Sequence, residues 1–83
     1  MRLQKKIKIG YLKEKYDEIE KAICWSIDVK TSIKTDELIE RVEWKIPGTR
    51  RKDILSVAEE LRYELEIFYD AKRDVWLLTP PHI

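Results

Sequence analysis

The sequence predicts a single α+β domain in which three helices precede a C-terminal two-stranded β-hairpin, with a short strand as an option after the first helix. Two periodicities carry this prediction. In three stretches before residue 65, at about residues 11–25, 35–46 and 49–64, apolar residues recur every three or four positions, which is the spacing of one face of a helix. From there to residue 79, apolar and polar residues alternate, which is the spacing of a strand.

The first helix is expected over residues 11–25, after a basic segment at residues 1–10. Its apolar positions repeat at i, i+4, i+7 and i+11, namely Leu12, Tyr16, Ile19 and Ile23. Residues 26–33 then place β-branched side chains at alternate positions, which predicts a short strand or an extended linker. For the basic segment, the sequence is compatible with a short strand, a flexible arm, the lead-in to the first helix or a solvated tail.

The second helix is expected from Thr35 to about Lys45, with Thr35 as its N-cap. Asp36 and Glu37 follow in the first turn, where the helix dipole favours negative charge. The apolar face of this helix consists of Leu38, Ile39, Val42 and Ile46.

The third helix is expected from Thr49 to Glu64, with Thr49 as its N-cap directly after a tight turn at Pro47 and Gly48. One face is apolar and is expected to pack on the core: Ile54, Val57, Ala58, Leu61 and Leu65. The opposite face is polar and carries Lys52, Ser56, Glu59 and Tyr63. Cations at a helix N-terminus oppose the helix dipole, so local stability does not explain Arg50, Arg51 and Lys52. A phosphate backbone would explain them.

The hairpin is expected to have alternating strands on either side of a loop from Asp70 to Asp74. Pro80 and Pro81 end the second strand because proline cannot donate a ladder hydrogen bond. The expected organisation is therefore a basic segment at residues 1–10, a domain at residues 11–80 and a tail at residues 81–83.

The order of helices, turn and hairpin resembles the winged helix-turn-helix family of DNA-binding domains over about residues 11–80. The closest cue is residues 65–79, which look like the wing of small transcription regulators, including compact ones from archaea and their viruses and plasmids. The resemblance implies that the third helix enters the major groove. It also implies that the hairpin tip, Lys72 and Arg73, touches phosphate or the minor groove.

These observations predict sequence-specific binding of double-stranded DNA by a transcriptional regulator. The residues expected to bind DNA are Thr49, Arg50, Arg51, Lys52, Ser56, Tyr63, Lys72 and Arg73. A homodimer is expected because one short helix offers few base contacts. The alternative is a winged-helix module that binds protein, which the net charge of only +1 and the acidic residues beside the basic ones support.

The tryptophans and the cysteine are also assigned positions. Trp25 and Trp76 are expected in the core, and Cys24 is expected to pack as a small hydrophobe. Trp44 lies off the apolar stripe of its helix and is a candidate contact residue.

Several classes of function lack support in the sequence. Cys24 is the only cysteine and His82 the only histidine, so we expect neither an intramolecular disulfide nor a Cys/His metal cluster. Gly10 and Gly48 cannot build a glycine-rich phosphate loop, and no enzyme, cofactor or small-molecule ligand is expected. The apolar runs are too short for a membrane span, which predicts a cytoplasmic protein, inside a host cell if the source is viral.

The composition predicts high thermal stability. Asparagine is absent, Gln4 is the only glutamine, and 40% of the residues are charged, a bias described for proteins of hyperthermophiles. We therefore expect a melting midpoint well above the range of about 45 to 65 °C where mesophile domains cluster. A calorimetric midpoint inside that range at neutral pH would contradict a thermophilic source.

Overall fold

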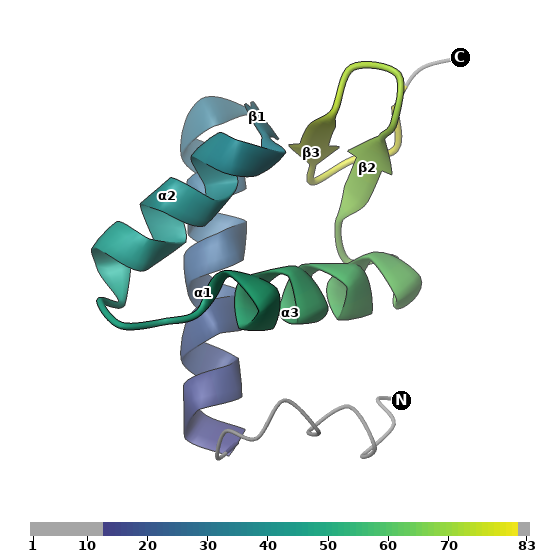
Figure 1. Ribbon diagram of the computed structural model, residues 1–83. Coiled ribbons are helices and arrows are strands. Elements are labelled where there is room, and N and C mark those ends of the chain that lie inside the picture. The colour runs from purple at the N-terminus through teal and green to yellow at the C-terminus, as the bar shows by residue number, and fades with distance from the viewer. Residues whose placement is uncertain (1–12, 82–83) are drawn as a thin grey trace.

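The computed structural model describes residues 13–81, so the expectations for residues 1–10 and for the end of the tail lie outside the described residues. The elements are α1 (Lys13–Lys30), β1 (Ser32–Lys34), α2 (Thr35–Lys45), α3 (Arg51–Tyr63), β2 (Phe68–Asp70) and β3 (Val75–Leu77). Three helices, a small antiparallel sheet and a C-terminal hairpin make the winged helix-turn-helix layout that the sequence predicts (Figure 1).

The sheet joins the hairpin to the helical part of the chain. Its strand order is β1-β3-β2, and β3 pairs antiparallel with both neighbours. Trp76 in the centre of β3 lies opposite Ile33 of β1 and Tyr69 of β2. The optional strand after the first helix therefore exists, and it brings the beginning of α2 beside the hairpin.

The first helix is longer than the sequence suggested. Residues 26–30 were expected to be extended, but they are helical, and only Ser32–Lys34 form a strand. Ile27 lies one turn beyond Ile23 on the fully buried stripe of α1, so its burial in the core outweighs the strand preference of a β-branched residue. The Ser26 hydroxyl is buried within this helix and donates a 2.8 Å hydrogen bond to the Ala22 carbonyl, which satisfies the hydroxyl there.

The core lies where α3 crosses α1 and α2 packs alongside them (Figure 1). The predicted stripe of α3 is confirmed for its first four members, which are fully buried: Ile54, Val57, Ala58 and Leu61. Trp76 is buried as expected, and Cys24 packs against the core. Trp25 is not a core residue, because 37% of it is exposed and the Lys45 ammonium lies 4.3 Å from its ring centroid.

The turn after α3 corrects the expectation for Leu65, which is 71% exposed and lies off the apolar stripe. The Glu66 amide donates to the Leu61 carbonyl, and the Leu65 amide donates to the Arg62 carbonyl. This pair of bonds is a Schellman motif, in which the residue after the cap takes a left-handed conformation. Leu65 has a φ of 63° in this position, which is usually occupied by glycine.

Leu65 therefore offers a test of the turn. Leu65→Gly should stabilise the domain by about 0.5 to 1 kcal/mol. The left-handed conformation costs a non-glycine residue about 1 to 2 kcal/mol, which glycine avoids. Part of this gain is offset because glycine gives the unfolded chain more conformational entropy. Leu65→Ala is the control, since alanine retains the left-handed penalty. Equal stabilities of the two variants in urea unfolding would show that backbone strain at this position is negligible.

Candidate nucleic-acid interface

The outer face of α3 is accessible along its whole length. Its predicted polar residues are all exposed: Lys52, Ser56, Glu59 and Tyr63. They repeat at i, i+4, i+7 and i+11, opposite the residues that pack on the core. The helix lies across α1 (Figure 1), and the exposure of these four residues places its polar face toward solvent.

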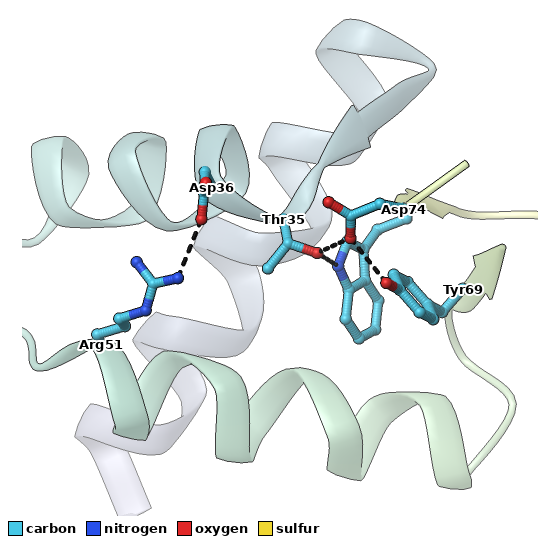
Figure 2. A network of polar contacts seen from close by, with 6 residues as sticks. Thr35, Asp36, Arg51, Tyr69 and Asp74 are labelled. Carbon is cyan, nitrogen blue, oxygen red and sulfur yellow. Dashed lines mark hydrogen bonds and ion pairs between the residues drawn. The ribbon is translucent and has the colours of Figure 1, made fainter. Parts of the chain in front are cut away.

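The arginines at the start of α3 are exposed but bonded to carboxylates. Arg51 donates a 3.0 Å hydrogen bond from Nη2 to Asp36, in the first turn of α2 (Figure 2). Arg50 donates from Nε to Asp53 at 3.1 Å, and Asp53 is buried. Lys52 has no ion pair within residues 13–81. The start of α3 thus combines two oriented arginines with a lysine that makes no ion pair in the described part of the chain.

Thr49 has a different role from the one expected. The N-cap of α3 is Arg50, with no capping bond from its side chain, and Thr49 is only 7% exposed. The Thr49 hydroxyl donates to the Ile46 carbonyl at 2.7 Å, so it closes the turn between α2 and α3 instead of capping the helix. Gly48 allows this turn through its φ of 89°. Thr49 therefore lies beneath the surface that its neighbours form.

Thr35 also differs from its expected role as the N-cap of α2. The capping position is Lys34, without a side-chain hydrogen bond, and Thr35 is the first helical residue. Its hydroxyl accepts a 2.9 Å hydrogen bond from the Trp76 indole and donates a 2.6 Å bond to the Asp74 carboxylate. The Tyr69 hydroxyl donates to the same carboxylate oxygen at 2.7 Å (Figure 2). This chain of bonds attaches the hairpin to the beginning of α2.

The hydrogen bonds of this network favour an ionised Asp74. The Thr35 hydroxyl, and after it the Tyr69 hydroxyl, hold the pKa of Asp74 below its ordinary value of 3.8. The same carboxylate raises the pKa of Tyr69, because the phenol must stay protonated to donate. At neutral pH the network is therefore a carboxylate with two hydroxyl donors.

The hairpin tip carries the second group of cations. Arg73 donates from Nε to Asp70 at 2.8 Å, and the Lys72 backbone amide donates to the other oxygen of Asp70 at 3.1 Å. The bond from Arg73 holds the pKa of Asp70 below its ordinary value. Lys34 of β1 joins this group, because its ammonium donates to the Arg73 carbonyl at 3.2 Å.

Lys34 is a candidate contact residue that the sequence did not indicate. It lies on the strand that precedes α2, and only the pairing of Lys34 with Val75 brings it beside the hairpin tip. The extended pattern of residues 26–33 suggested a strand there, but no local signal named its partner. The start of α2 therefore lies between the two predicted groups of cations, with Arg51 on one side and the hairpin on the other (Figure 2).

The ion pairs on this surface are compatible with binding a polyanion. The carboxylates opposite Arg51 and Arg62 are largely exposed, and such pairs contribute about 0 to 1 kcal/mol. A phosphate group can therefore replace these carboxylates at low cost. Lys72, like Lys52, has no ion pair among residues 13–81.

Comparisons with protein-family models, with curated proteins and with solved structures gave no match to this chain. Within residues 13–81, no three histidine, cysteine or acidic side chains lie close enough together to hold a metal ion. None of the helices in this range has the length and apolar content needed to cross a membrane. The candidate site described above consists of α3, the start of α2 and the hairpin tip, which the bonds of Arg51, Thr35 and Lys34 connect.

The pKa shift of Asp74 generates a prediction about acid stability. A lowered folded pKa means that the charged network stabilises the fold above about pH 4, and that this contribution is lost as the pH falls through the folded value. Asp74→Asn keeps an acceptor oxygen and tolerates the φ of 55° at this position, but it removes the charge. The variant should melt below the wild type at about pH 6, and the gap should narrow at about pH 3. A gap independent of pH in thermal melts would show that the charge contributes nothing.

Proposed function

We propose that this chain is a transcriptional regulator that binds double-stranded DNA, with α3 in the major groove and the hairpin tip on the phosphate backbone. One observation carries the proposal: the uncovered face of α3 and the cationic hairpin tip are linked through the first turn of α2. A helix fits the major groove, which is about 12 Å wide. Cations beside the helix then meet the two phosphate strands that border the groove.

The distribution of charge along α3 favours entry by its N-terminal end. Arg50, Arg51 and Lys52 gather at this end, whereas Glu59 lies two turns further along. Arg62 donates to Glu59 at 2.8 Å, which partly offsets its repulsion of phosphate. In this orientation the long cationic side chains contact base edges, and the carboxylates stay away from the backbone.

We further propose that the regulator acts as a homodimer. A single α3 of 13 residues presents about two turns to the bases, so one copy reads only a few base pairs. Two copies on a palindromic site double the number of base contacts.

Binding of protein by the same winged helix is the alternative function. Trp44 is 75% exposed at the end of α2, and Tyr63 and Leu65 are exposed at the end of α3. Aromatic side chains of this kind are enriched at protein interfaces. This alternative predicts binding that depends on the aromatic residues and responds only weakly to salt.

The DNA proposal predicts different effects for the tip and for the helix. Replacing both Lys72 and Arg73 by Ala should weaken binding to all duplexes alike and lower the slope of log K against log salt by up to about 0.9 per lost phosphate contact. Arg51→Ala should instead reduce discrimination between sequences, since an arginine bound to guanine contributes about 1 to 3 kcal/mol of it. Fluorescence anisotropy with duplexes of mixed sequence and with a selected site measures both effects.

Two further variants complete this experiment. Glu59→Gln should leave the affinity unchanged or raise it modestly, because it removes a carboxylate from the proposed surface. Trp44→Ala should leave DNA binding unchanged. If the tip variant and Arg51→Ala both bind like the wild type over a full salt titration, the DNA surface is wrong and the protein-binding alternative replaces it.

A further inference from the structure

The hairpin tip contains a carboxylate whose place on a DNA-binding surface needs an explanation. Asp70 lies at the end of β2 and is followed by Lys72 and Arg73. A carboxylate beside phosphate should weaken binding, so a tip selected only for positive charge would lack it. The orientation of Asp70 offers a reason for its presence.

Both oxygens of Asp70 face the hairpin. One accepts from the Lys72 amide at 3.1 Å and the other from Arg73 Nε at 2.8 Å, and the side chain is only 18% exposed. The first bond shapes the turn, and the second fixes the guanidinium of Arg73. The carboxylate therefore stabilises the conformation of the tip, and little of its surface is accessible to a ligand.

The atom that Asp70 holds determines what Arg73 can still do. A guanidinium has five N–H donors in one plane, and a bond at Nε leaves the two terminal nitrogens at the opposite end. The Arg73 side chain as a whole is 67% exposed, and within residues 13–81 its ion pair with Asp70 is made through Nε. Two terminal nitrogens match two oxygens of a phosphate, and a guanidinium that is already oriented loses less entropy when it binds.

Lys34 lies at the same tip through a separate contact. Its ammonium donates to the backbone carbonyl of Arg73 at 3.2 Å, and the pairing of β1 with β3 fixes the strand that carries it. The tip thus presents cations from two elements that are distant in sequence. The tip carries three cationic side chains, Lys34, Lys72 and Arg73, and two carboxylates, Asp70 and Asp74. The cations therefore outnumber the carboxylates.

We propose that Asp70 is a positioning residue that holds Arg73 by Nε, so that the terminal nitrogens of Arg73 and the ammonium of Lys34 bind the DNA phosphate backbone. This inference rests on the proposed function and adds two residues to it. Asp70 acts through Arg73 and does not touch the ligand. Lys34 touches the backbone directly.

The two possible roles of the Asp70 carboxylate predict opposite changes in DNA affinity when it is replaced by asparagine, and the test uses this difference. If Asp70 is only a negative charge near the DNA, Asp70→Asn raises the affinity for a mixed-sequence duplex in any background. If it positions Arg73, Asp70→Asn weakens binding several-fold and lowers the salt slope by up to about 0.9. Asparagine keeps one acceptor for the Lys72 amide but has no second oxygen for Arg73.

The decisive comparison repeats this substitution in an Arg73→Gln background. There the positioning role is already lost, so Asp70→Asn should leave the affinity unchanged or raise it, and the salt slope should not fall further. A loss of affinity in both backgrounds would mean that Asp70 merely maintains the turn. A gain in both would mean that it is a bystander charge, and either result overturns the proposal.

Lys34→Gln tests the second contact independently. It should lower the salt slope by up to about 0.9, and Lys21→Gln, at an exposed lysine on the outer side of α1, should leave the slope unchanged. Equal slopes for Lys34→Gln and the wild type would remove Lys34 from the site. If Asp70→Asn does not fold, Asp70→Ser serves instead, because its hydroxyl can still accept from the turn amide.

These measurements separate the inference from the function on which it rests. A wild-type chain that does not bind duplex DNA at low salt overturns both. A wild-type chain that binds with a steep salt dependence, combined with an Asp70→Asn variant that binds more tightly, overturns only the positioning role.

Discussion

The pairing of β1 with β3 is the interaction on which the rest of this structure depends. A hairpin of two short strands is marginally stable in water, and this one gains a third strand only from the segment before α2. The same pairing places Thr35 within reach of Trp76 and Asp74, so the sheet and the hydrogen-bond network support each other. Without β1, the hairpin would lose its third strand and keep only the packing of Ile67 and Trp76 on the helices.

The electrostatic character of the surface follows from this construction. Net charge is only +1, and the cations of the proposed surface lie at the start of α3 and at the hairpin tip. Arg50, Arg51 and Arg73 each lie against a carboxylate of the same domain. Such pairs orient the guanidinium groups and lower the attraction for unspecific polyanions. For the DNA-binding function proposed above, both effects would favour a specific site over other sequences.

Much of the fold could be predicted because it depends on local patterns. The limits of α2 agree with the structure, and the stripe from Ile54 to Leu61 lies in the core. The errors arose where a tertiary contact overrides local preference, or where a turn ends a helix earlier than its apolar pattern suggests. Ile27 is helical because the core accepts it there, and Leu65 leaves its stripe because the helix ends before it.

The candidate site also contains some residues whose position follows from local patterns and others whose position depends on tertiary structure. The exposure of Lys52, Ser56 and Tyr63 follows from helical periodicity, so the sequence predicts it correctly. The burial of Thr49 depends on a turn whose closure the sequence does not specify. Lys34 is absent from the predicted surface because its position depends on strand pairing between distant segments.

The length of α1 has a consequence for how two copies could meet DNA. This helix contacts α2, α3, β1 and β3, so it supports most of the elements that carry the proposed surface. Its continuation to Lys30 leaves only Thr31 between it and β1. If a second copy packed on α1, the α3 helices of the two copies would therefore lie at a fixed separation, with no hinge between them. The spacing between operator half-sites, about one helical repeat or a multiple of it, would then be a rigid property of the assembly.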